Sequence, residues 1–239
     1  MVIGGSFETK VTQKFTKFAS KQNRNTMKKV AVVIAGCGVM DGAEINEAVM
    51  TLYAINKQGA EYTIFAPDIQ QHHVVNHMTG QVMNEKRNVL VEAARIARGK
   101  IKSLKEFNPG LFDAIIFPGG FGVAKNLCTF AFERDRCSVN PEVEKAIRSM
   151  VNLGKPVGLL CISPVIAARL FRGVELTIGN DPGTASAIGK MGGKHIVTTH
   201  GQVVRDKTYN IFSTPCYMLD ANIVQIAEGA ENIVRAILD

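Results

Sequence analysis

The chain has 239 residues, of which 46% are hydrophobic and 21% charged, and its formal net charge is +7. This length suits one α/β domain with a full core. No apolar run approaches the roughly 18 residues of a membrane-spanning helix, so we expect no membrane partner. The positive charge is concentrated in residues 1–26, which carry a net charge of +4. Because the rest of the chain mixes both signs and has no nucleic-acid-binding motif, we expect no nucleic-acid partner.

Residues 1–26 are basic, rich in Lys, Thr, Ser, Gln and Asn, and lack the apolar segment of a secretory signal. We expect them to be a disordered extension of a single domain that spans residues 27–239. Two interpretations of this extension are open. A dispensable segment before Met27 predicts a cytoplasmic protein, which is the localisation we expect. An organellar transit peptide would instead predict a protein of the mitochondrial matrix.

Apolar runs alternate with amphipathic stretches from residue 29 onward, which predicts strands and helices in turn. We expect strands at residues 30–35, 62–66, 114–117, 157–160 and 209–214, and two short ones at 196–199 and 203–204 that are compatible with a hairpin. We expect helices at residues 44–58, 88–98, 141–153, 163–170 and 221–238. This order predicts an α/β fold with a mostly parallel sheet between helices on both faces. The long connection between Pro67 and Asp113 is expected to shape an active site.

Cys161 stands between a predicted strand and a helix that opens with Ser163 and Pro164. Unpaired backbone N–H groups and the positive end of a helix dipole at such a turn favour a thiolate. An enzyme with a Cys161 nucleophile is therefore the first hypothesis. The other four cysteines are scattered and form no CxxC pair, so we expect free thiols, a reducing compartment and no metal site.

Two further segments should meet Cys161, because ligands bind at the carboxyl ends of parallel strands. Glu44 and Glu47 begin the first helix, where they either stabilise the helix dipole or point inward and exchange protons with the Cys161 sulfur. Gly119 and Gly120 follow a strand and form either a tight turn or part of an oxyanion hole. In the second case the amides of Gly120 and Ile162 would stabilise charge on a substrate oxygen.

The loop of residues 36–42 lies at the same predicted end of the sheet and contains Cys37. It fails as a dinucleotide-binding fingerprint because Asp41 occupies the place of the last glycine, and the chain has no phosphate-binding loop. We therefore expect no cofactor. None of the five histidines is adjacent to Cys161, so no Cys–His pair is assigned, and His77 is expected at the surface.

Taken in order, these segments resemble the ElbB family of proteins associated with isoprenoid biosynthesis. That family belongs to the PfpI-like branch of the class I glutamine amidotransferase-like superfamily. The resemblance runs from about Met27 to the C-terminus. Its motifs are AGCGVMDG at 35–42, EINEA at 44–48, FAPD at 65–68, residues 87–96, PGGFGVAKNL at 118–127, CISP at 161–164 and residues 214–219.

The resemblance implies a flavodoxin-like three-layer sandwich in which Cys161 is the nucleophile and Glu47 hydrogen-bonds to it. Gly120 and Ile162 would supply the oxyanion amides. We assign Glu44, Gly119 and Cys37 to substrate binding. Family members are associated with a weak, cofactor-independent glyoxalase activity that converts glyoxal to glycolate, with methylglyoxal as a second candidate substrate. A homodimer is also implied.

The chain departs from other branches of the superfamily at two positions. Protease-like relatives place a histidine directly after the cysteine, where this chain has Ile162, and deglycase-like relatives have a histidine where this chain has Gly179. Peptidase and glutaminase activities are therefore not expected. Three hypotheses remain: a glyoxalase-like enzyme acting on small dicarbonyls, a redox or stress-response protein using the same cysteine, and a non-catalytic accessory protein.

Overall fold

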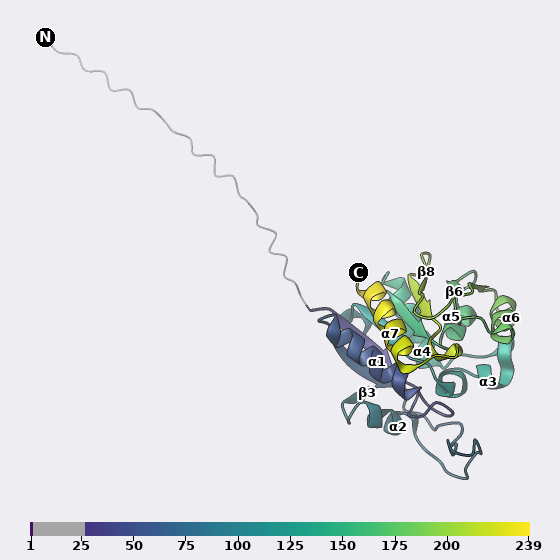
Figure 1. Cartoon of the computed structure of the whole chain (residues 1–239). Helices are drawn as coiled ribbons and strands as arrows, with labels where there is room; N and C mark the ends of the chain where they lie inside the picture. The colour runs from purple at the N-terminus through teal and green to yellow at the C-terminus, as the bar shows by residue number, and fades with distance from the viewer. Residues whose placement is uncertain (2–26) are drawn as a thin grey trace.

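The computed structural model describes Met1 and residues 27–239, so the disorder expected for residues 1–26 lies almost entirely outside the described residues. A seven-stranded sheet forms the centre of the fold, in the order β3-β2-β1-β4-β5-β9-β8 (Figure 1). All its neighbouring strands are parallel except β8, which runs antiparallel to β9. The strands are β1 Lys29–Val33, β2 Glu61–Ala66, β3 Ile101–Ser103, β4 Ala114–Phe117, β5 Val157–Leu160, β8 Val204–Asp206 and β9 Ile211–Thr214; β6 Glu175–Leu176 and β7 Lys194–His195 form a separate pair.

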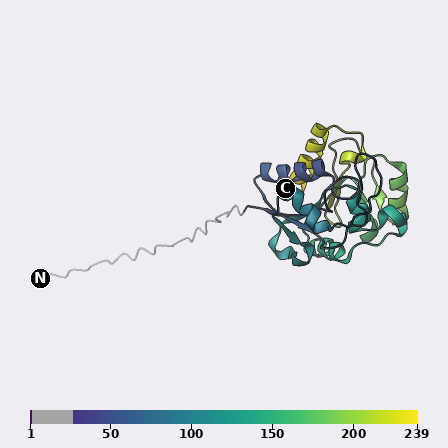
Figure 2. The same cartoon turned by 90° about the horizontal axis from the view of Figure 1, so that it is seen from below.

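Helices cover both faces of the sheet, and each face has its own apolar core. Along β1, Val30 and Val32 enter one core while Ala31 and Val33 enter the other, as the alternation of a strand dictates. The first core is closed by α1 Ile45–Lys57, α2 Val89–Ile96 and α7 Ile223–Leu238. The second is closed by α3 Phe130–Glu133, α4 Pro141–Asn152, α5 Pro164–Leu170 and α6 Pro182–Lys190. Helices α1 and α7 pack side by side in both views (Figures 1 and 2).

This architecture confirms the predicted α/β, flavodoxin-like sandwich with a mostly parallel sheet. The predicted strand at residues 196–199 is wrong: the strand there is β7, which ends at His195 and pairs with β6. Ile196 and Val197 are instead exposed, so they do not contribute to a core. The strand near residue 204 pairs with β9, and the hairpin does not form.

Short helical turns outside the α-helices carry several residues of the site. A π-helix covers Val123–Leu127, directly after β4 and its glycine loop. Turns of 3₁₀ helix cover Leu104–Glu106, Pro109–Leu111, Arg134–Arg136 and Cys216–Met218. Within the described residues, no helix combines the length and apolarity needed to cross a bilayer.

Candidate active site

Cys161 occupies a strained turn between β5 and α5. Its φ is +59°, in the left-handed region that costs a residue with a side chain about 1–2 kcal/mol. Two contacts hold the turn in place: the Cys161 amide donates to the Thr214 carbonyl at 2.9 Å, and the Ser163 hydroxyl donates to the Pro118 carbonyl at 3.0 Å. Strain of this kind persists only where the surroundings impose it, and it is common at active sites.

Glu47 is wholly buried beside this turn and is fixed by hydrogen bonds from distant parts of the chain. The Gly119 amide donates to its Oε2 at 2.9 Å, and the Tyr217 amide donates to its Oε1 at 3.1 Å. Glu44 caps helix α1, because its Oε2 accepts the Glu47 amide proton at 2.6 Å. The remaining partner of the Glu47 carboxylate is the Cys161 thiol.

Burial dominates the electrostatics of this pair. It raises the pKa of Glu47 to about 7, and the neighbouring Glu44 adds to the effect. Burial and the Glu47 carboxylate together raise the pKa of Cys161 well above its ordinary value, against the opposing hydrogen bonds from the amides of Gly120 and Ile162. The expectation that the helix N-terminus makes Cys161 a thiolate is therefore wrong. This environment favours the thiol over the thiolate, with Glu47 as its side-chain partner.

The glycine loop after β4 lies too close to the pair to carry side chains. A Cβ on Gly119 would lie 2.4 Å from the Cys161 Cβ and 2.7 Å from the Glu47 Oε2. Gly120 has a φ of +100°, and a Cβ there would lie 2.3 Å from the Glu44 amide nitrogen. These glycines let the backbone approach Cys161 directly, and the Gly120 amide contacts its sulfur as a result.

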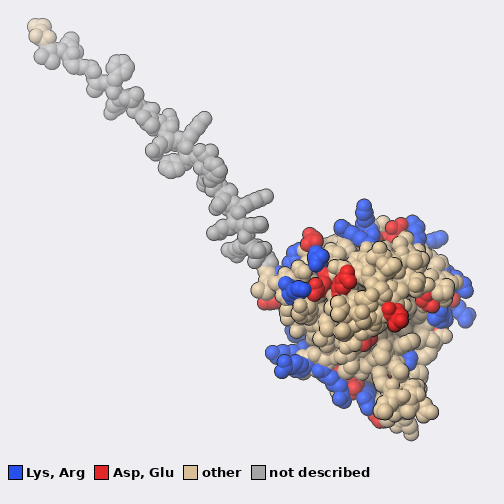
Figure 3. Space-filling view, viewed as in Figure 1, with Lys and Arg blue, Asp and Glu red and all other residues tan. Residues whose placement is uncertain are grey.

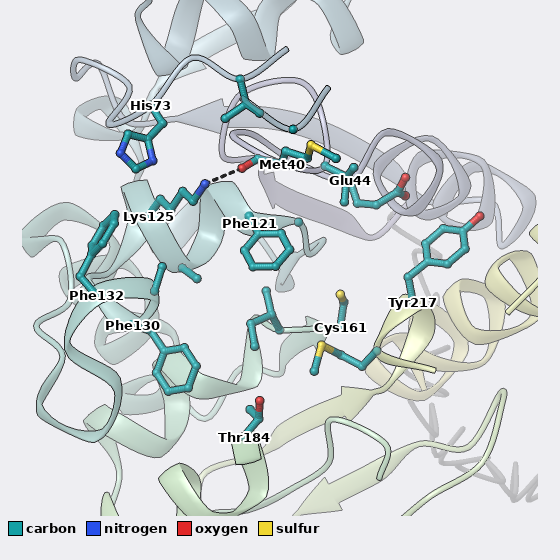
Figure 4. A pocket seen from close by; sticks show the side chains of 18 of the residues that line it. Met40, Glu44, His73, Phe121, Lys125, Phe130, Phe132, Cys161, Thr184 and Tyr217 are labelled. Atoms are coloured by element: carbon teal, nitrogen blue, oxygen red, sulfur yellow. Dashed lines mark hydrogen bonds between the residues drawn. The ribbon is translucent and has the colours of Figure 1, made fainter. Parts of the chain in front are cut away.

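Cys161 lines a pocket of about 680 Å³ whose walls are mainly apolar (Figure 4). Glu44, Gly120 and Ile162 line it as well, so the structure brings these predicted residues together around Cys161. Glu47 and Gly119 lie directly behind them and contact the cysteine. The pocket also contains residues for which the sequence predicted no role in the site: Lys125, Arg134, His73, Tyr217, Thr184 and three phenylalanines, Phe121, Phe130 and Phe132.

Cys37 and His77 lie outside this pocket. The charged groups that act on the Cys37 thiol are Glu92, Arg95 and Asp41, and burial raises its pKa. His77 braces the loop after β1, since its Nε2 accepts the Met40 amide proton at 3.1 Å. The structure thus gives Cys37 no contact with the ligand space around Cys161.

The site combines groups suited to acid–base and nucleophilic chemistry. Among the described residues, no group of three or more His, Cys, Asp and Glu side chains is arranged to hold a metal ion. A buried thiol, a carboxylate with a pKa near neutrality and two converging backbone amides suit addition to a carbonyl group, with the amides facing the developing oxyanion.

Comparison with known proteins identifies the family. The glutamine amidotransferase-like class 1 domain-containing protein 3, mitochondrial, of Homo sapiens is 45% identical over 221 residues, which cover 88% of this chain and 82% of that protein. The chain belongs to this family. The ES1 protein homolog, mitochondrial, of Rattus norvegicus is 43% identical over 221 residues, which cover 88% of this chain and 83% of that protein. No family model matches the chain.

Solved structures agree with this assignment and with the resemblance to isoprenoid-biosynthesis proteins. An isoprenoid biosynthesis protein with an amidotransferase-like domain from Ehrlichia chaffeensis superposes with a TM-score of 0.83 at 36% identity, covering 88% of this chain and 98% of that one. A glyoxalase III from Candida albicans shares the fold alone, with a TM-score of 0.58 at 14% identity over 89% of this chain and 96% of that one. The names of the human and rat relatives place them in mitochondria, and the comparisons do not support the cytoplasmic prediction.

Proposed function

We propose that this protein is a cofactor-independent enzyme that converts dicarbonyl compounds to hydroxy acids through Cys161. The observation that carries the proposal is the buried contact between the Cys161 thiol and Glu47, whose pKa is raised to about 7. A general acid–base group works best when its pKa lies close to the operating pH. The fold shared with a glyoxalase III supports the reaction class.

The proposed reaction begins with addition of the Cys161 sulfur to the aldehyde carbon. The thiol proton passes to Glu47 as the carbon–sulfur bond forms, and the amides of Gly120 and Ile162 hold the resulting oxyanion. Glu47 returns this proton to the oxyanion, which gives the neutral hemithioacetal and restores the carboxylate. Glu47 then moves a proton from the aldehyde carbon to the neighbouring carbonyl carbon through an enediol, which converts the hemithioacetal into a thioester. Water hydrolyses the thioester, releases the hydroxy acid and restores the thiol. The net reaction adds one water to the dicarbonyl and needs no external oxidant or reductant.

The protonation state of Cys161 favours this enzyme over a redox sensor. Oxidation by peroxide proceeds through the thiolate, and sensor cysteines combine a low pKa with exposure to solvent. Cys161 is buried and its pKa is raised. An enzyme with a neighbouring base needs the thiolate only at the moment of attack. A selective oxidation of Cys161 by mild peroxide, seen by intact mass, together with background turnover of glyoxal, would favour the sensor instead.

Turnover with glyoxal, methylglyoxal and glycated amines tests the proposal directly. We expect wild-type protein to form glycolate from glyoxal, and Cys161→Ala and Glu47→Gln to fall to the uncatalysed rate. Cys37→Ala is the matched control, because Cys37 is a free thiol outside the pocket. Full glyoxal turnover by Cys161→Ala would eliminate the proposal, and so would equal losses in the Cys161 and Cys37 variants.

We further propose that residues 1–26 act as a mitochondrial transit peptide. Their net charge of +4 and their hydroxyl-rich composition support this, as do the names of the mitochondrial relatives. A fluorescent fusion of the full chain should enter mitochondria, and a fusion that begins at Met27 should stay in the cytosol. Identical distribution of the two fusions would contradict the proposal.

A homodimer is the proposed assembly. Its support is an apolar stripe on α1, where Ile45, Val49 and Tyr53 are spaced by one helical turn and are each at least 43% exposed. Figure 3 shows an uncharged area on the face that carries α1 and α7, bordered by clusters of acidic and basic side chains. Light scattering should give twice the chain mass, and Val49→Glu should reduce it to that of one chain.

A further inference from the structure

The pocket is much larger than the substrate proposed so far. Glyoxal has four heavy atoms and occupies on the order of 100 Å³, if each atom takes about as much volume as a water molecule. The pocket measures about 680 Å³, within the range of roughly 300–1,000 Å³ that is typical of sites for larger organic ligands. Most of its volume therefore lies beyond the reacting carbonyl.

The part of the pocket away from Cys161 is lined by apolar and aromatic groups, together with positively charged ones. Phe121, Phe130 and Phe132 supply aromatic faces, while Lys125 and Arg134 supply the positive charges. Figure 4 shows Lys125 beside His73, on the side of the pocket away from Cys161. The only carboxylate that lines the pocket among the described residues, Glu44, lies at the cysteine end.

Neither cation forms an ion pair within the described part of the chain. Lys125 donates one hydrogen bond, to the Met40 carbonyl at 2.8 Å, and two of its three donors are left over. Arg134 interacts electrostatically with Asp181. The Asp181 carboxylate already accepts the Thr184 amide proton at 2.7 Å and so caps α6. Partial burial lowers the pKa of Lys125, against the opposing attraction of the Asp41 carboxylate.

A buried polar atom on the same wall also lacks a partner. The Nδ1 of His73 is inaccessible to solvent and makes no hydrogen bond to any described residue. Buried polar atoms are almost always satisfied in folded proteins, and exceptions call for a ligand, a water or a catalytic role. Burial together with the neighbouring His72 and Lys125 lowers the pKa of His73, against the opposing effect of Asp41, and so favours the neutral ring. His73 lines the pocket beside Lys125, so its unpaired Nδ1 marks a polar wall that the described residues do not satisfy.

Both cations are held by uncommon backbone geometry. Lys125 belongs to the π-helix Val123–Leu127, a form that occurs frequently at functional sites. Arg134 has a φ of +51° and a ψ of −122°, a conformation that is costly for a residue with a side chain. Two separate local distortions thus position the positive charges that line this pocket.

From these observations we propose that the natural substrate is a carbonyl compound with an apolar body and a carboxylate or phosphate group, and that Lys125 and Arg134 bind this anionic group. The inference rests on the proposed function of Cys161. Lys125 on the side of the pocket away from Cys161, and Glu44 and Glu47 beside the cysteine, would orient such a substrate with its carbonyl toward the thiol. Glyoxal would then be a poor substrate, because it would contact only the end of the pocket that contains Cys161.

Kinetics with phenylglyoxal and 4-carboxyphenylglyoxal test the anion site, because the two probes differ by one carboxylate. Initial rates are required, since dicarbonyls also modify arginine. We expect the carboxylated probe to have a KM at least about tenfold lower, as charge-assisted hydrogen bonds predict. Lys125→Met and Arg134→Gln should each remove most of this difference by raising the KM for the carboxylated probe.

The matched controls are Lys102→Met and Arg98→Gln. Both residues are exposed and outside the pocket, and Arg98 shares the positive φ of Arg134, at 53°. These variants should keep the preference for the carboxylated probe. An equal KM for the two probes in wild-type protein, or equal effects of the pocket and control variants, would overturn the proposal.

A binding measurement separates this inference from the proposed function. Calorimetry on Cys161→Ala would compare benzoate, phenyl phosphate and benzyl alcohol. Selective binding of an anion that is lost in Cys161→Ala/Lys125→Met supports the anion site even if no dicarbonyl is turned over, and the tighter of the two anions identifies the group. Turnover of glyoxal without selective anion binding would overturn the inference and leave the proposed function standing.

Discussion

Gly119→Ala perturbs the site without removing any reactive group. The added carbon would lie 2.4 Å from the Cys161 Cβ, 2.7 Å from the Glu47 Oε2 and 2.8 Å from the Cys161 Sγ. Non-bonded carbon atoms prefer separations of about 3.5–4.0 Å, so the glycine loop or the cysteine must move by about 1 Å. A displacement of that size typically costs about 100-fold in rate, and overpacking typically costs about 1–3 kcal/mol in stability.

Gly189→Ala is the matched control. Gly189 lies in α6, and an added Cβ would have no atom within 4 Å. Alanine at a compatible helical position typically stabilises a protein by about 0.4–1 kcal/mol. Glycolate formation from glyoxal and thermal unfolding, measured on both variants, should show loss of activity in Gly119→Ala and unchanged activity in Gly189→Ala. Full activity in a folded Gly119→Ala protein would refute the role given to the contact between Cys161 and Glu47.

Three other predictions follow from the same contacts. The rate for glyoxal at limiting concentration should rise with pH through about 7 as Glu47 becomes the base, and this inflection should disappear in any residual activity of Glu47→Gln. Because the pKa of Glu47 lies above its ordinary 4.5, the protonated form favours the folded chain; this stabilisation is complete below pH 4.5 and is lost as the pH rises through about 7. Between pH 4.5 and pH 8, the free energy of unfolding measured with urea should therefore fall by about 3 kcal/mol more in wild-type protein than in Glu47→Gln. An equal change in the two proteins would contradict the buried carboxylate. Asn126→Ala should lower the free energy of unfolding by about 1–3 kcal/mol and reduce activity. Asn126 donates to the Asp41 carbonyl at 3.0 Å and accepts from the His72 amide at 2.9 Å, so it joins the loops that contain these two residues. An unchanged free energy of unfolding would show that these loops are held by other contacts.

Local sequence signals were enough to locate the nucleophile turn. The apolar run before Cys161 forms β5 with the predicted bounds, and Ser163 and Pro164 open a helix after it. The glycine pair after β4 was also identified correctly as the segment that faces the cysteine. These features depend on neighbours in the sequence, so the pattern reports them directly.

The protonation of the site could not be predicted in the same way. The amides that fix Glu47 belong to Gly119 and Tyr217, which are 72 and 170 residues away. Their packing removes Glu47 and Cys161 from water, and that desolvation outweighs the helix N-terminus. A helix N-terminus favours a thiolate at an exposed turn, but this turn is buried.

The residues at the far end of the pocket were missed for a different reason. A π-helical turn places Lys125 and a left-handed φ places Arg134, and neither conformation follows from apolar periodicity. Helix α6 did have a signal: Asp181 caps it and Pro182 occupies its first position. The helix contains two glycines and few apolar residues, so its sequence lacks the apolar periodicity by which the other helices were predicted.

The central claim is that the Cys161 thiol carries out the carbonyl chemistry. Proton NMR of glycolate formation from glyoxal, with wild-type and Cys161→Ala proteins at equal concentration, tests it most directly. We expect wild-type protein to form glycolate faster than the protein-free sample does, and Cys161→Ala to form it at the same rate as that sample. Equal rates for wild-type and Cys161→Ala proteins, both above the protein-free sample, would contradict it.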